Sequence, residues 1–267
     1  MSARSNLVNL DAMIKRADFS ILVDDESSHE KVNSIGARDL ISQNSLSILL
    51  RKPDFQRETN HWNPEQVVSL LECYINGDLI PSVILWKSPT YLFVIDGGHR
   101  LSVIRAWIED DYGDGPISHQ LFGHEVSNEQ KRSAKRTREL VNARVKPWSY
   151  YANASSEKSY SPEELRKISI VASRALPVQW VDGNVDKAEK SFFNINSKGT
   201  PLDDIEEKLL KYRKNPIAIA SRSIIRSGKG HKYWSKFSNE NQANIEEMSQ
   251  KIHHILFDPE INRPIKT

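Results

Sequence analysis

The alternation of apolar and polar positions divides the chain into short strand-like runs and longer segments with helical spacing. Residues 91–95 are five consecutive strand-favouring residues, and 79–86 form a second such run, joined to the first by the turn 87–90. These two runs predict a β-hairpin, and 176–181 predicts a further strand. Helical spacing of apolar residues predicts most of the remaining elements. The predicted helices cover about 64–76, 98–108, 162–174, 185–195, 202–213, 216–227 and 241–257.

The sharpest helix boundaries are marked by pairs of a capping residue and proline. Asn63-Pro64, Ser161-Pro162 and Thr200-Pro201 each place an N-cap side chain before a proline in the first helical turn, and a further helix follows Asn215-Pro216. Strands followed by many helices predict an α+β fold with a small mixed sheet and a mostly helical second half. We expect an N-terminal arm over 1–34, weakly ordered with at most one strand, a nucleotide-binding domain over 35–155, and a mainly helical part over 156–267 packed on it.

Composition narrows the class of protein. With 267 residues, 38% of them hydrophobic and 27% charged, the chain can bury one large core or two modest ones. The lone cysteine, Cys73, excludes an internal disulfide framework and a cysteine-based zinc site, and its own side chain is expected in the core. No segment has the length of a membrane span and the N-terminus lacks a signal pattern, so we expect a soluble cytoplasmic protein.

The stretch Asp96-Gly97-Gly98-His99-Arg100 joins the predicted 91–95 strand to the next helix. Adjacent glycines allow unusual backbone conformations and let a ligand come close. The helix start offers unpaired N–H groups and a positive dipole end, which His99 and Arg100 would repel unless a negative group lay between them. A phosphate is the simplest such group. Alternatively, the two glycines only ease packing, and Arg100 caps a neighbouring loop.

Other charged and polar segments each allow a functional and a structural interpretation. The acidic stretch 109–115 could hold a divalent cation or be a solvated loop. The basic stretch 131–146 could contact DNA or be a wet helix face, and the aromatic residues Trp148, Tyr150 and Tyr151 could stack on bases or anchor a helix end. The polar link 196–199 could contact a base or sugar through Asn196, or cap a helix. If DNA binds, we expect it at Lys131, Lys135 and Arg138.

Three motifs occur in an order that resembles a known family. They are Phe55-Gln56-Arg57 followed by the helix after Trp62, the stretch 94–101 around the DGGHR sequence, and the stretch 193–199. Over about 35–210, this arrangement is similar to the ParB/sulfiredoxin-like domain of GmrSD- and SspE-type restriction proteins, whose usual signature is Asp-Gly-Gln-Gln-Arg or Asp-Gly-Gln-His-Arg.

The resemblance implies binding or hydrolysis of a nucleoside triphosphate and a place in defence against phage or modified DNA. By position, Asp96 to Arg100 look like the phosphate-binding turn, Gln56 and Arg57 converge on it, and Asn196 supplies an amide. We expect hydrolysis with Mg²⁺, in which Asp96, His99 and Arg100 are the catalytic residues and Asp96 is the metal ligand. The alternatives are a ParB-like DNA-binding adaptor without turnover and an antitoxin-like or scaffold protein in which the turn is purely structural.

Two departures from the family limit these expectations. Sulfiredoxin places its reactive cysteine where this chain has Gly98, so sulfur chemistry is excluded. Gly98 also replaces the glutamine of the restriction-protein signature, which makes hydrolysis less secure than binding. No His-Asn-His-type cluster follows residue 210, so we expect no DNA cleavage by this chain alone, and a nuclease partner or fused C-terminal domain is the implied effector. The oligomeric state stays open, a homo-oligomer included.

Overall fold

The computed structural model describes residues 6–19, 30–56, 58–122, 126–155, 158–198, 204–229 and 232–257. The chain divides into two compact units, 1–201 and 202–267. Both the N-terminal segment and the elements that follow residue 156 contribute to the sheet and the core of the first unit.

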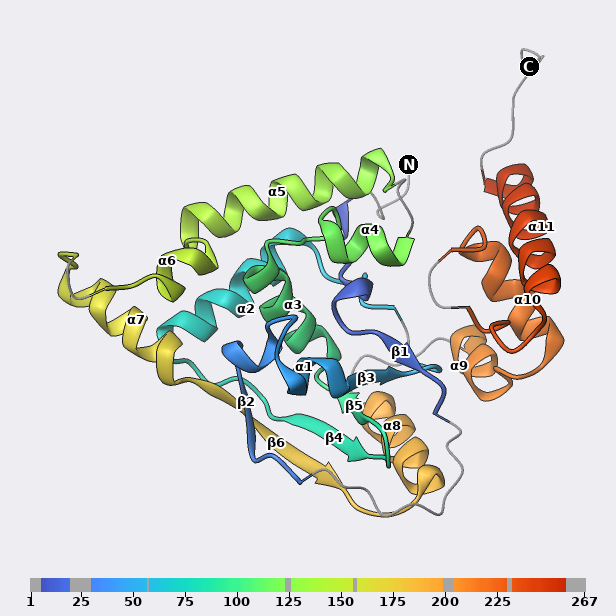
Figure 1. Ribbon diagram of the computed structural model, residues 1–267, viewed down its shortest axis with the longest axis horizontal. Helices are drawn as coiled ribbons and strands as arrows, with labels where there is room; N and C mark the ends of the chain where they lie inside the picture. Colours follow the sequence, from blue (N-terminus) through green and yellow to red (C-terminus); the bar gives the residue numbers. More distant parts are fainter. Residues whose placement is uncertain are drawn as a thin grey trace, which may run out of the picture. The chain divides into compact units, whose positions relative to one another are not determined.

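A six-stranded mixed sheet organises the first unit (Figure 1). The order across the sheet is β1-β3-β5-β4-β6-β2, with β5–β4 and β6–β2 antiparallel and the other neighbours parallel. The α+β prediction and the predicted hairpin are thereby confirmed. The strands are β1 (Arg16–Ala17), β2 (Ser34–Gly36), β3 (Leu50–Pro53), β4 (Val83–Lys87), β5 (Leu92–Asp96) and β6 (Ala175–Val181).

Successive residues of β5 enter cores on opposite faces of the sheet. Leu92 and Val94 belong to the main core, which α2 (Pro64–Asn76), α3 (Gly98–Glu109) and α5 (Asn128–Arg144) help to form. Phe93 instead joins an aromatic cluster with Phe19 and Trp86, and Phe192 of α8 (Val185–Lys198) reaches the same cluster through Phe55. Since side chains alternate along a strand, β5 is covered on both faces. Four of its five residues are buried for that reason.

The N-terminal segment is part of this core. Residues 11–13 form a short 3-10 helix, β1 pairs with β3, and six apolar side chains of the segment are buried. The expected weakly ordered arm is therefore wrong for residues 6–19. Neither a two-residue strand nor a single helical turn leaves a periodic pattern in the sequence, and their order comes from burial. The buried apolar residues are Val8, Leu10, Ala12, Met13, Ile14 and Phe19.

Shorter helices complete the first unit. The caps expected at Asn63 and Ser161 are present, since each accepts a hydrogen bond in a capping box at the start of α2 and α7, respectively, whereas Thr200 lies outside the described residues. Cys73 is half-buried and packs against the main core. The other helices are a 3-10 helix (Ala37–Leu40), α1 (Ser45–Leu49), α4 (Pro116–Phe122), α6 (Trp148–Ala152) and α7 (Pro162–Ser173).

The second unit is helical where it is described. It contains α9 (Asp204–Lys211), α10 (Pro216–Ile225) and α11 (Asn239–Phe257), close to the predicted ranges. Trp234 is fully buried and its indole N–H donates to Glu246 of α11. Across the parts of the chain that are described, no helix combines the length and apolar character needed to cross a membrane.

Candidate functional site

The junction between β5 and α3 has the strand–turn–helix form that the sequence predicts. Gly97 adopts φ +91° and occupies the N-cap position of α3, whose first residue is Gly98. A Cβ atom at Gly97 would lie 3.1 Å from Val83 Cγ2 and 3.3 Å from Val83 Cα. Both the backbone angle and the close approach of β4 therefore require glycine here. Because a glycine cap has no side chain, the first N–H groups of α3 receive no side-chain cap.

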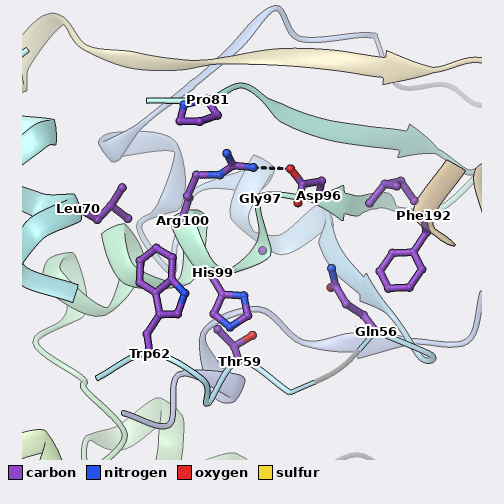
Figure 2. Close-up of a pocket in the computed structure, with 12 residues that line it drawn as sticks. Gln56, Thr59, Trp62, Leu70, Pro81, Asp96, Gly97, His99, Arg100 and Phe192 are labelled. Carbon is purple, nitrogen blue, oxygen red and sulfur yellow. Dashed lines mark hydrogen bonds and ion pairs between the residues drawn. The ribbon is translucent and has the colours of Figure 1, made fainter. Parts of the chain in front are cut away.

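A pocket of about 400 Å³ opens at this junction (Figure 2). It brings together Gln56 and the whole stretch from Asp96 to Arg100, as the sequence predicts. Figure 2 shows Gly97 in the middle of the site, with Trp62 and Leu70 on one side and Phe192 on the other. The remaining lining residues are Thr59, Pro81 and Ile95.

Asp96 and Arg100 form an ion pair across the mouth of the pocket. Arg100 Nη2 donates to Asp96 Oδ2 at 2.5 Å, and the two side chains are 14% and 39% exposed, respectively. They lie four residues apart, so the start of α3 brings them together. An anion entering the pocket would compete with Asp96 for this guanidinium.

His99 is placed by aromatic neighbours. Its ring stacks against Trp62 with centroids 5.5 Å apart and an angle of 23° between the planes, and His61 lies 6.1 Å away. Trp62 immediately precedes Asn63, the N-cap of α2, and this position fixes the direction in which its side chain leaves the backbone. Sequence reasoning did not assign Trp62 to the site. Its position in the sequence could have indicated this role, because Trp62 is an aromatic residue that lies between the Phe55-Gln56 motif and the N-cap Asn63.

Gln56 and Thr59 form one wall of the pocket. The amide of Gln56 lies against Gly98, where a Cβ atom would be 3.5 Å from both its Oε1 and Nε2 atoms. Gln56 Oε1 is buried without a hydrogen-bond partner among the described residues. Thr59 is 3% exposed, and its hydroxyl accepts a hydrogen bond from Lys52. Sequence reasoning missed Thr59, and a buried threonine in an irregular segment leaves no signal.

Two predicted site residues are not placed in the pocket. Arg57 lies outside the described residues. Asn196 belongs to α8, and its side chain is not described. The predicted polar link 196–199 is wrong for its first three residues, because α8 continues to Lys198. The helix continues through these polar residues despite the low helix propensity of Asn196 and Ser197.

The basic segment lies on α5, away from residues that line the pocket. Lys131 and Lys135 are exposed on this helix. Arg138, by contrast, pairs with Asp110 at 2.9 Å and Asp114 at 2.7 Å, and the hydrogen bonds that its guanidinium donates to Asp114 and Asp110 raise its pKa. Its charge is therefore balanced within the protein, which leaves the two lysines as the DNA contacts that the sequence predicts.

The acidic stretch takes neither of its expected roles. Asp111 is fully buried and accepts hydrogen bonds from the backbone N–H groups of Gly113, Gly115 and Ser118. Its carboxylate thus organises the turn before α4. Asp110 and Asp114 hold Arg138, and the described residues contain no group of three side chains suited to a metal ion.

The aromatic residues after α5 anchor a helix end. Trp107 of α3 makes edge contacts with Trp148 at 5.2 Å and Tyr151 at 5.5 Å. The Tyr151 hydroxyl donates to the carbonyl oxygen of Val145, and the Tyr150 hydroxyl donates to Glu164. Of the two interpretations offered by the sequence, packing is confirmed.

The chain was compared with known protein families, curated proteins and solved structures. The model of the family described as GmrSD restriction endonuclease, N-terminal domain, matches residues 37–213, which is well over half of the chain. No curated protein matched, and neither did any solved structure. The match includes Gln56, the Asp96–Arg100 stretch and all of α8. The chain therefore belongs to the GmrSD restriction endonuclease N-terminal domain family, among the proteins of restriction and phage-defence systems.

Proposed function

We propose that the pocket at the start of α3 binds a nucleoside triphosphate with Mg²⁺ and hydrolyses it as part of a restriction system. The observation that carries this proposal is the convergence of Asp96, Gly97, Gly98, His99, Arg100 and Gln56 on one cavity at an uncapped helix N-terminus. Unpaired N–H groups and the positive dipole end make such a terminus an anion site.

The phosphate chain would lie over Gly97 and Gly98. The N–H groups of Gly98 and His99 precede the first intrahelical hydrogen bond, which Leu101 donates to Gly97 at 3.0 Å. Groups at this position of a helix are not used by the intrahelical hydrogen bonds, and in the proposed complex they would donate to phosphate oxygens, together with the His99 ring. The absence of a Cβ atom at either glycine lets the phosphate approach the backbone closely.

Arg100 and Asp96 would exchange partners when the triphosphate binds. A phosphate offers Arg100 a stronger anionic partner than the half-exposed Asp96, and the guanidinium can contact it with two N–H groups. Asp96 would then be free to act as a ligand or to orient a water molecule. Its oxygens suit Mg²⁺, which commonly uses one or two carboxylates together with phosphate oxygens and supplies charge neutralisation.

Nucleotide titration tests this proposal. Binding of ATP, GTP, CTP and UTP, each with and without Mg²⁺, and release of phosphate would be measured for the wild type, Asp96→Ala and Arg100→Ala. We expect Arg100→Ala to weaken binding at least tenfold, since charge-assisted hydrogen bonds contribute about 1.5–3 kcal/mol. Asp96→Ala should abolish the effect of Mg²⁺.

The matched control for the arginine substitution is Arg166→Ala, which removes an exposed arginine from α7. It should leave both binding and phosphate release unchanged. If both site variants bind and hydrolyse like the wild type, the assignment of the pocket is wrong.

A second candidate function, DNA binding without turnover, is favoured by the exposed basic face of α5. Lys131, Arg132, Lys135 and Arg136 are all exposed there. Affinity for duplex DNA should then fall steeply with salt and weaken in Lys135→Glu, but not in Arg166→Glu, and no nucleotide should be needed. DNA cleavage is in either case assigned to a nuclease partner or fused domain.

A further inference from the structure

Three charged side chains lie buried behind the wall of the pocket that Gln56 and Thr59 form. We call Asp11, Arg16 and Lys52 the buried charge cluster; their side chains are 4%, 2% and 0% exposed. Arg16 Nη1 donates to Asp11 Oδ2 at 2.6 Å, and Lys52 Nζ donates to Asp11 Oδ1 at 2.7 Å and to the Asp11 carbonyl oxygen at 2.9 Å. The carboxylate of Asp11 therefore joins two cations from two strands, β1 and β3.

The buried charge cluster also holds both ends of the pocket wall. Arg16 Nη2 donates to the carbonyl oxygen of Gln56 at 3.0 Å. Lys52 Nζ donates to the Thr59 hydroxyl at 3.0 Å, and the Thr59 N–H donates to Asp11 Oδ1 at 3.1 Å. The position of the Gln56 amide beside Gly98 thus depends on side chains that do not themselves line the pocket.

The cluster places a cation next to the pocket. Lys52 Nζ donates to the hydroxyl of Thr59, and Thr59 itself lines the pocket, so the buried ammonium lies one side chain away from it. A positive charge at this position would attract an anion in the pocket, and the surrounding protein screens this attraction less than water does.

We propose that the buried charge cluster is a positioning and electrostatic part of the site, which fixes the Gln56–Thr59 wall and favours a phosphate group in the pocket. This inference rests on the proposed triphosphate binding and assigns to Asp11, Arg16 and Lys52 a role in it. Lys52 is the residue whose charge can be removed while the Asp11–Arg16 ion pair remains.

The charge of Lys52 should depend on pH within an accessible range. Burial lowers the pKa of Lys52 to about 8, with Asp11 opposing the shift and Arg16 adding to it. The groups that act on its ammonium are Asp11 from the 3-10 helix, Arg16 from β1, and Glu58 and Thr59 from the segment after β3. The charge of Glu58 raises the pKa of Lys52. A bound anion would stabilise the protonated form, so affinity should fall as the pH rises through this pKa.

Calorimetry on the full chain tests the inference. The ligand is whichever of ATP, GTP, CTP and UTP binds most tightly to the wild type, without metal, over a range in which the charge on its phosphates is constant. We expect wild-type affinity to fall about tenfold between about pH 7.5 and 9, the size expected for one charge acting across a protein interior. Lys52→Met should bind about tenfold more weakly at the lower pH and lose this pH dependence.

Lys15→Met is the matched control, because Lys15 is exposed and undergoes the same change of charge close by in the chain. It should retain wild-type affinity and pH dependence. A folded Lys52→Met variant that binds like the wild type at both pH values would overturn the inference and leave triphosphate binding intact. If Lys52→Met does not fold, a wild-type affinity that stays constant over this range overturns it. A wild type that binds no triphosphate refutes the proposed function, and this inference with it.

Discussion

Gly97 and Gly98 are neighbours with different structural requirements. Gly97 combines φ +91° with a close approach to the backbone of Val83. Gly98 lies in α3, and a Cβ atom added to it would make only ordinary van der Waals contacts. Gly97→Ala should therefore lower the free energy of unfolding by about 1–3 kcal/mol, the usual cost of forcing a residue with a Cβ atom into this conformation. Urea unfolding monitored by circular dichroism would measure the change.

Gly98→Ala is the control for this comparison. Its Cβ atom would lie 3.5 Å from the Gln56 amide, which is normal van der Waals contact. We expect the variant to be as stable as the wild type or more stable by up to about 1 kcal/mol, because alanine loses less chain entropy in a helix. Equal destabilisation by the two substitutions would contradict this account of the turn.

The site residues that could be predicted from the sequence are those within one local motif. Asp96 to Arg100 are consecutive, so a strand followed by a helix start was enough to place them together. Lys52, by contrast, lies between Arg51 and Pro53, and nothing in this part of the sequence indicates that its side chain is buried. Its partner Asp11 is far away in the sequence and reaches it through the pairing of β1 with β3, and Thr59 reaches it through the fold of an irregular segment.

At the scale of elements, the boundaries with capping signals were predictable. Asn63 accepts a hydrogen bond from the N–H of Gln66 at 3.0 Å, and the Gln66 side chain accepts one from the N–H of Asn63 at the same distance. The two-residue β1 and three-residue β2 were not, because such short strands exist only through their pairing with β3 and β6. α8 also extends beyond its predicted end at Ile195.

The N-cap of α2 should affect the pocket as well as stability. Asn63 directly follows Trp62, and α2 carries Leu70 into the lining. Asn63→Ala should cost about 0.5–2 kcal/mol of unfolding free energy, the usual loss for an N-cap, and should also weaken triphosphate binding because Trp62 and His99 lose their fixed arrangement. Thermal unfolding and nucleotide titration on the same samples would check both effects.

Ser161→Ala provides the comparison, since Ser161 forms the same type of capping box at α7, which contributes no residue to the pocket lining. It should cost a similar free energy of unfolding and leave binding unchanged. Equal loss of binding in the two variants would mean that stability alone, not the position of Trp62, governs the site.

At the scale of the whole molecule, the N-terminal segment matters more than the family match indicates. The match begins at residue 37, but Val8 donates to the carbonyl oxygen of Trp62 and Leu10 donates to that of Thr59, each at 2.8 Å. These backbone hydrogen bonds connect the segment directly to two residues that line the pocket. The buried charge cluster adds Asp11 and Arg16 to the same connection.

Truncation from each end should therefore give opposite results. A chain starting at residue 37 loses β1, β2 and the buried apolar side chains of Val8, Leu10, Ala12, Met13, Ile14, Phe19 and Ile35. Each of the larger of these side chains contributes roughly 1.5–3 kcal/mol when buried. Together they are comparable with the whole stability of a domain, about 5–15 kcal/mol, so we expect this fragment to be unfolded or aggregated.

A fragment ending at residue 201 keeps the sheet, its cores and all residues of the pocket, and should unfold cooperatively. Circular dichroism and urea unfolding of the two fragments would distinguish these outcomes. A folded fragment starting at residue 37 would show that the first unit does not depend on its N-terminal segment.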